Sequence, residues 1–201
     1  AAEATAIVIG IARQHGALVV PHHPATAAMG CDWSLGHDPE VERLVEIYST
    51  WGSSERYLGE GHPRRIHSGE VHGQHVVDAL QRGYRFGIIA SGDVHDGRPG
   101  HSLNRSNLGQ LAGLMGVWAR DLTRESVFRA MWNRHVYGTT GCRVVLRFSM
   151  SGRPMGSMIP YQNDLPVEVD VRSEAPISQI VLVRNGEDCA TKEPGGLCEV
   201  V

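Results

Sequence analysis

Several features are scarce in this chain of 201 residues, and each scarcity excludes a class of protein. The sequence has no apolar run long enough for a membrane span and no signal-peptide pattern at its start. It also lacks a basic stripe interleaved with aromatic residues, and its net charge is only -3. Lys192 is the single lysine among 19 basic residues, which indicates genome composition bias and not function. We therefore expect neither a membrane nor a nucleic acid as a partner.

Cysteine is too sparse and too widely spaced for a zinc knuckle. The cysteines are Cys31, Cys142, Cys189 and Cys198, and no two of them form a C-x-x-C pair. Cys189 and Cys198 can close a terminal loop by a disulfide, although free thiols are the favoured state. Because cysteine usage does not separate oxidising from reducing compartments here, the sequence leaves the localisation unknown.

Histidine, in contrast, is abundant, and it is concentrated in the first half of the chain. Of the 11 histidines, all but His135 lie between positions 15 and 101. The apolar run 88–90 predicts a buried strand, and Asp93 and His95 follow it. On an extended backbone, residues two apart project to the same side, so we expect this carboxylate and imidazole to face one point. Such a pair suits zinc, manganese or iron better than calcium or magnesium.

Helices and strands are predicted to alternate before residue 100, which is typical of a parallel α/β sheet or barrel. His22 and His23 follow one predicted strand, and Glu46 lies near the end of another. The polar segment 49–70 is expected to be a long loop, and His62, His67, His72 and His75 are interpreted as solvated residues, not a zinc cluster. In chain order we predict a helix over 1–15, a strand over 17–20, a helical turn over 38–43, a strand over 44–48, a helix over 75–82 and the strand over 88–90.

The second half of the chain changes its hydrophobic period. A helix is predicted over 123–134 with Thr123 as its cap, and apolar residues then alternate from Arg143 onward as in antiparallel strands. Asn185-Gly186 is typical of a hairpin turn. We expect strands over 145–148, 167–171 and 180–183, and two domains, 1–141 and 142–201, the second a small β-rich, sandwich-like module.

Three of these stretches, 19–24, 45–48 and 87–95, together resemble the C-terminal half of the PHP (polymerase and histidinol phosphatase) superfamily of metal-dependent phosphoesterases. Thr139-Thr140-Gly141 and the β-rich tail are similar to a bacterial branch of that superfamily. The resemblance implies an α/β fold, a partial, distorted β/α (TIM-like) barrel followed by a small antiparallel β module. It also implies up to three zinc, manganese or iron ions at the carboxyl ends of the strands. The implied ligands are His23, Asp93 and His95, with His22 as a ligand or a supporting residue and Glu46 as a weaker candidate.

The chain departs from that pattern because the superfamily's first His-x-His motif is absent. His22 and His23 are not expected to replace it, since adjacent residues of a strand point to opposite faces. We therefore expect a fragment of the barrel that cannot complete a three-metal site by itself.

The implied activity is metal-dependent hydrolysis of a small-molecule phosphoester, which makes the parent protein an enzyme. Arg98 can grip the substrate phosphate with two hydrogen bonds, or it can be a solvated loop residue. Amide or deaminating hydrolysis would use the same activated water. The alternative function is a non-catalytic binding or scaffold module with a degenerate metal site. Self-association through the incomplete barrel is also expected.

Overall fold

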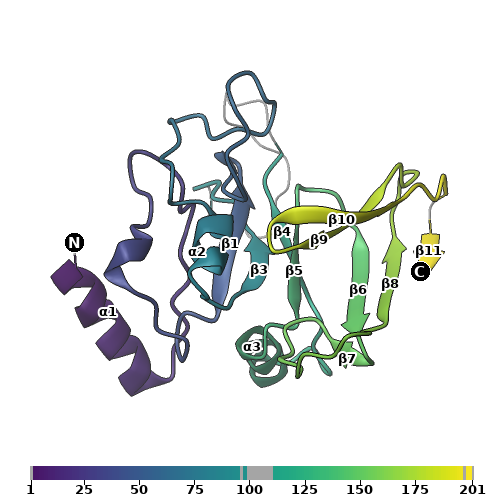
Figure 1. The fold of residues 1–201 in the computed structure, drawn as a ribbon. Helices are drawn as coiled ribbons and strands as arrows, with labels where there is room; N and C mark the ends of the chain where they lie inside the picture. The colour runs from purple at the N-terminus through teal and green to yellow at the C-terminus, as the bar shows by residue number, and fades with distance from the viewer. Residues whose placement is uncertain (1, 96, 99–110, 197, 201) are drawn as a thin grey trace.

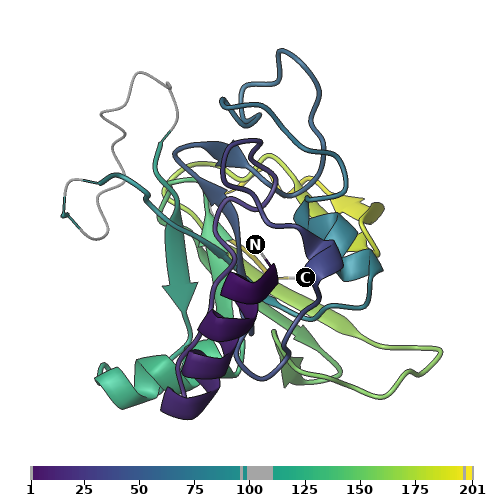
Figure 2. The ribbon, with the colours of Figure 1, turned by 90° about the vertical axis from the view of Figure 1, so that its left-hand side faces the viewer.

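The computed structural model describes residues 2–95, 97–98, 111–196 and 198–200 as several small sheets with three α-helices (Figure 1). In the first half, β1 pairs in parallel with β3 and antiparallel with β2, in the order β2-β1-β3. Figure 2 shows α1 on the outside of the molecule, in front of the sheets. The elements of this half are α1 (Ala2–His15), the 3-10 helix η1 (Trp33–Leu35), β1 (Leu44–Ser49), β2 (Gly52–Ser53), α2 (Val76–Gln81) and β3 (Gly87–Ala90).

The core lies on both faces of the β1–β3 pair. Val45 packs with Trp33, Val76 and Ala79 on the side of α2. Leu44 and Ile89 pack with Val136 on the opposite side. Successive strand residues face opposite sides of a sheet, so this short parallel pair is buried on both faces.

The second half consists of antiparallel strands and one helix, α3, which lies at one end of them (Figure 1). Thr123 caps α3, because its hydroxyl accepts a hydrogen bond from the Ser126 amide at 3.2 Å. Its sheets have the orders β4-β5, β11-β8-β6-β7 and β10-β9. The elements are β4 (Leu114–Val117), α3 (Arg124–Trp132), β5 (Val136–Thr139), β6 (Val145–Met150), β7 (Arg153–Pro154), β8 (Val167–Arg172), β9 (Ile180–Arg184), β10 (Glu187–Lys192) and β11 (Cys198–Val200).

Many individual elements predicted from the sequence are confirmed. The three α-helices begin and end close to their predicted positions, and β1, β3, β6, β8 and β9 lie where strands are expected. Asn185 and Gly186 connect β9 to β10 with φ angles of 56° and 84°, as a type I′ hairpin turn requires. Cys189 is a free thiol, which is the state that the sequence favours.

The predicted partial β/α barrel is wrong. Within the described residues, β1 and β3 are the one pair that runs parallel, and the small separate sheets do not close around a common axis. Residues 17–20 are not a strand, although Val19 donates a hydrogen bond to Val41 O at 3.0 Å. Residues 38–43 form a turn and not a helix. A short apolar run fits a buried connection as well as a strand, so its hydrophobicity alone misled the prediction.

The neighbour of β3 on its other side is the antiparallel pair of β4 and β5, with α3 between them in the chain, which the sequence did not predict. Gly138 of β5 lies so close to β3 that a Cβ there would be 2.8 Å from Ala90 N. A barrel would place a crossover helix and a further parallel strand beside β3. The structure has the antiparallel β4–β5 pair there instead. Separately, no helix within the described ranges is long and apolar enough to cross a lipid bilayer.

Candidate metal centre

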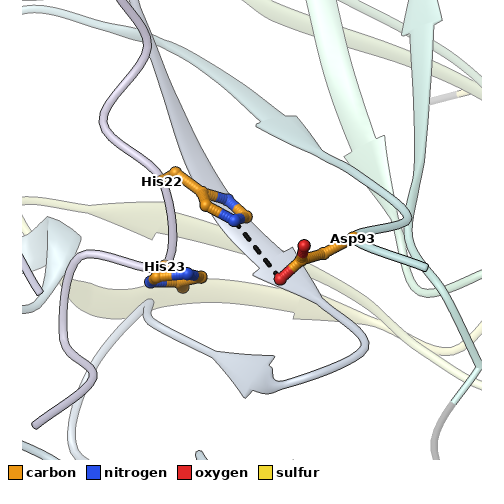
Figure 3. A group of neighbouring side chains, drawn as sticks. All are labelled: His22, His23 and Asp93. Atoms are coloured by element: carbon orange, nitrogen blue, oxygen red, sulfur yellow. Dashed lines mark ion pairs between the residues drawn. The ribbon is translucent and has the colours of Figure 1, made fainter. Parts of the chain in front are cut away.

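Three predicted ligands meet where two segments of the chain come together: His22 and His23 are neighbours on one segment, and Asp93 lies on the segment after β3 (Figure 3). Each offers one ligand atom, and these atoms all lie within 4.8 Å of one another. His22 Nε2 is 3.3 Å from Asp93 Oδ2, the ion pair drawn in Figure 3. The Asp93 side chain is only 6% exposed, whereas that of His22 is 43% exposed. The cluster therefore has a buried base and one side open to solvent.

The two histidines share this cluster, which contradicts the expectation that they point to opposite faces. Their ring centroids are only 3.8 Å apart. The expectation assumed an extended strand, but His23 has a φ angle of 31° and lies outside any strand. A left-handed residue turns the chain, so two neighbouring side chains can face the same point.

Backbone strain is concentrated at the same residues. Asp93 and His95 have φ angles of 47° and 52°, so, like His23, they occupy the left-handed region that non-glycine residues rarely adopt. The extended backbone predicted through Asp93 and His95 is therefore wrong, since β3 already ends at Ala90. Strained residues of this kind persist where the surrounding structure holds them, and they are frequent at functional sites.

Glu46 of β1 lies behind His22 and not inside the cluster. Its carboxylate is 2.9 Å from His22 Nδ1, accepts the His23 amide at 3.0 Å and also accepts the Ser91 hydroxyl. Glu46 is 3% exposed, so these hydrogen bonds are shielded from water. A carboxylate that receives Nδ1–H fixes the ring orientation and leaves Nε2 as the ligand atom. Glu46 is therefore suited to support His22.

Thr26 has the corresponding position behind His23. Its hydroxyl lies 3.1 Å from both the carbonyl oxygen and Nδ1 of His23. The carbonyl oxygen can only accept, so the single hydroxyl hydrogen of Thr26 must point to it. The hydroxyl oxygen is then left to accept a second hydrogen bond. Both bonds therefore coexist when Nδ1 of His23 carries a hydrogen and donates it. In that tautomer, Nε2 of this buried imidazole keeps its lone pair for a ligand bond.

The two histidines have shifted acidities in opposite directions. Burial lowers the pKa of His22, but hydrogen bonds and charges from Glu46 and Asp93 outweigh it, so the pKa is raised. For His23, burial and then the positive charge of His22 lower the pKa. His22 therefore carries a proton between two carboxylates more readily than a free histidine does, and His23 carries one less readily.

The remaining predicted site residues lie outside the three-residue cluster. The His95 side chain is 76% exposed, and its Nε2 is 2.5 Å from Asp93 Oδ1, the oxygen that does not face His22. Arg98 is on an exposed stretch beyond it. The structure thus places His95 against the aspartate and outside the three-residue cluster, and the role of Arg98 stays a prediction.

Sequence reasoning missed the supporting residues Thr26 and Ser91. Thr26 comes three residues after His23, and Ser91 directly follows β3, so their spacing to the predicted ligands was the available signal. It also misplaced His75, which is only 2% exposed and lies with Nε2 3.6 Å from Glu70 Oε2. His62, His67 and His72 are exposed as expected.

Comparisons with known proteins give relatives without an assigned activity. Residues 101–164 match a family described as a protein of unknown function (DUF3604). The chain is 31% identical over 192 residues to an uncharacterized protein of Chlamydia muridarum (strain MoPn / Nigg), with 90% of this chain and 31% of the relative covered. An uncharacterized protein of Chlamydia trachomatis serovar D is also 31% identical over 192 residues, with 90% of this chain and 31% of the relative covered. No solved structure matches.

An uncharacterized protein of Chlamydia pneumoniae is likewise 31% identical, over 181 residues, with 86% of this chain and 29% of the relative covered. The chain thus spans about a third of the length of these curated relatives. The family that matches is described only as being of unknown function, and the separate small sheets do not form the β/α barrel that the PHP resemblance implied. The resemblance expected from the short motifs is therefore wrong, and the candidate centre has to be argued from its own geometry.

Proposed function

We propose that this chain holds a divalent metal ion at His22, His23 and Asp93, and that the protein is a metal-dependent hydrolase acting on phosphoesters. The observation that carries the proposal is the convergence of two imidazoles and one carboxylate within 4.8 Å. These two ligand types together suit zinc, manganese or iron.

The spacing of the donor atoms supports a metal site. Adjacent ligands at about 2.1 Å from one ion lie roughly 3.0 to 3.4 Å apart, depending on the coordination geometry. His22 Nε2 and Asp93 Oδ2 are 3.3 Å apart, within that range. The supporting contacts of Glu46 and Thr26 favour Nδ1–H on both rings, which leaves Nε2 available on each.

A bound divalent ion would supply hydroxide near neutral pH, because it lowers the pKa of its water from 15.7 towards about 7. The chain's own residues hold the arrangement. Glu46 keeps the His22 ring in place, Thr26 keeps that of His23, and His95 contacts the second oxygen of Asp93. His22 and His95 are the more exposed members, so a substrate would approach from their side. Arg98, also exposed, is the proposed contact for the phosphate group of the substrate.

Metal binding is the first property to test. Purified wild-type protein and Asp93→Asn are titrated with ZnCl₂ and MnCl₂ by calorimetry, and their metal content is measured by elemental analysis. The wild type should bind about one equivalent, and the variant should bind at least roughly tenfold more weakly, because it loses an anionic ligand. Asp121→Asn is the matched control, since this side chain is 64% exposed and outside the cluster. Equal binding by all three proteins would overturn the site.

Hydrolysis is tested separately, on the metal-loaded protein. p-Nitrophenyl phosphate and bis-p-nitrophenyl phosphate serve as the monoester and diester probes. Turnover that depends on the added metal and disappears in Asp93→Asn supports the hydrolase. A protein that binds the metal at this site but hydrolyses neither probe would favour the binding module over the enzyme.

A further inference from the structure

A second site lies beneath the β9–β10 hairpin. Figure 1 shows this hairpin reaching from the second half of the chain across to α2 and β3. Between them is a cavity of about 740 Å³, which we call the hairpin cavity. Its lining residues are Ile47, Glu55, Arg56, Val76, Val77, Leu80, Gln81, Ile88, Val183, Asn185 and Gly186. None of the metal-cluster residues is among them, so the cavity is a different site.

Most of the residues that line the hairpin cavity are aliphatic. Ile47 of β1 and Ile88 of β3 come from the sheet, and α2 supplies two valines and Leu80. Val183 of β9 faces them from the hairpin. Leu80 and Val183 are 43% and 44% exposed, so these apolar side chains line the space and do not fill it.

Two contacts hold the hairpin above this space. At its tip, Gly186 packs so closely on α2 that a Cβ there would be 2.6 Å from Val77 Cγ2. Along its side, Arg56 Nη2 is 3.8 Å from Asp188 Oδ1 of β10. These contacts join the hairpin to α2 and to Arg56, which precedes α2 in the chain.

The size and charge of the cavity define the class of ligand. Its volume is within the range of roughly 300 to 1,000 Å³ that is typical of small-molecule sites. The charged lining residues are Glu55 and Arg56, and their side chains are 3.8 Å apart. Because these two charges balance, the lining does not favour an ion, whereas the amides of Gln81 and Asn185 can bond an uncharged polar group.

We propose that the hairpin cavity binds a neutral, mainly aliphatic small molecule with a hydroxyl or similar uncharged head. The aliphatic part lies against Ile47, Ile88 and the α2 side chains, where it removes apolar surface from water. The head lies at the rim, beside the amides. This site is independent of the proposed metal centre.

The probe for this proposal is 1-decanol, added to the full chain and followed by calorimetry and by methyl NMR. Val183→Trp and Leu80→Trp place a large side chain in the cavity from opposite walls. We expect saturable binding near one equivalent to the wild type and at least about tenfold weaker binding to each variant, because the added ring occupies the ligand's volume. Both residues are partly exposed, so these changes should not prevent folding, which circular dichroism checks.

Val145→Trp is the matched control, since Val145 is 43% exposed on β6 and does not line this cavity. It should bind 1-decanol as the wild type does, and so should Asp93→Asn. Absence of saturable binding, or binding that both cavity variants leave unchanged, would overturn the site. Tighter binding of decanoate or decylammonium than of 1-decanol would overturn the assignment of a neutral head.

Discussion

Near the candidate metal centre, the single carboxylate of Glu46 holds several neighbouring groups in position. It accepts hydrogen bonds from the His22 ring, the His23 amide and the Ser91 hydroxyl, at a position that is 3% exposed. Residues that orient a metal-binding histidine change the affinity for the metal without touching the ion. Glu46 should therefore control the affinity of the site although it lies outside the cluster.

We predict that Glu46→Gln weakens zinc binding by roughly 10- to 100-fold, because the amide group cannot accept all of these hydrogen bonds. Calorimetric titration of the folded variant measures the change. Glu55→Gln is the control, since this side chain is 43% exposed and is not among the cluster residues. Unchanged affinity in Glu46→Gln would show that the ring orientation of His22 does not depend on this carboxylate.

Asp38 gives a prediction for acid stability. Burial raises the pKa of this carboxyl group, but hydrogen bonds from Arg13 and from the Glu40 amide outweigh it and leave the pKa lowered. A group whose pKa is lowered by folding stabilises the protein above its unfolded pKa, near 3.9, and loses that contribution as the pH falls through the folded pKa.

Asp38→Asn should therefore lower the free energy of unfolding at pH 7, and the difference from the wild type should shrink below about pH 4. Urea unfolding at both pH values measures it. Glu40→Gln is the control, because this carboxylate is 71% exposed and lies 3.6 Å from Arg13 Nε, so its effect should be small. A difference that persists at low pH would mean that the amide hydrogen bonds, and not the charge, are responsible.

The residue types of the candidate centre could be found from the sequence, but their geometry could not. Histidines after an apolar stretch and an aspartate after the β3 strand correctly marked residues that come together. The extended-strand assumption then failed at His23, Asp93 and His95, because left-handed backbone at non-glycine residues leaves no clear pattern in the sequence. Contacts such as Thr26 with His23 depend on that same local turn.

Elements with strong local signals were predicted more reliably than their pairing. α3 has a threonine cap, and the β9–β10 hairpin has an Asn-Gly turn, so both are specified by neighbouring residues. Whether β3 is flanked by a parallel strand or by the antiparallel β4–β5 pair depends on long-range packing, which short apolar runs do not encode. Most of the helices and strands were thus predicted correctly. The fold class was wrong because the pairing of the strands was not predicted.

Two glycines in different elements should respond to alanine in opposite directions. A Cβ at Gly138 of β5 would meet the β3 backbone, with Ile89 C and Ala90 N each at 2.8 Å. At Gly10, inside α1, a Cβ meets nothing within 4 Å. Alanine at Gly138 should force β5 away from β3. Alanine at Gly10 meets no neighbouring atom, so its effect is to reduce the conformational freedom of the unfolded chain and to favour the helix.

We predict that Gly138→Ala lowers the free energy of unfolding by about 1 to 3 kcal/mol. Gly10→Ala should raise it by about 0.5 to 1 kcal/mol. Urea denaturation of the two variants beside the wild type measures both signs in one experiment. Stability losses of similar size in both variants would contradict the close approach of β5 to β3.

At the scale of the whole molecule, α1 presents an apolar surface to solvent. It stands on the outside in Figure 2, and Ile7, Val8 and Ile11 are 56%, 52% and 54% exposed. Contiguous exposed apolar side chains on a helix are typical of interaction sites. Self-association was expected from an incomplete barrel, and that reason no longer holds, but the outer face of α1 gives a different reason for the same prediction.

We predict that the chain self-associates with increasing concentration, and that Ile7→Glu with Ile11→Lys shifts it towards the monomer. The two positions are one helical turn apart, so the new charges form a favourable pair and α1 is preserved. Sedimentation velocity over a concentration series measures the association. Leu122→Glu is the control, because Leu122 is 99% exposed and lies outside α1. If α1 makes the contact, a new charge at Leu122 should leave the association unchanged. A wild type that stays monomeric throughout the series would contradict the prediction, and an equal response to the control would place the contact outside α1.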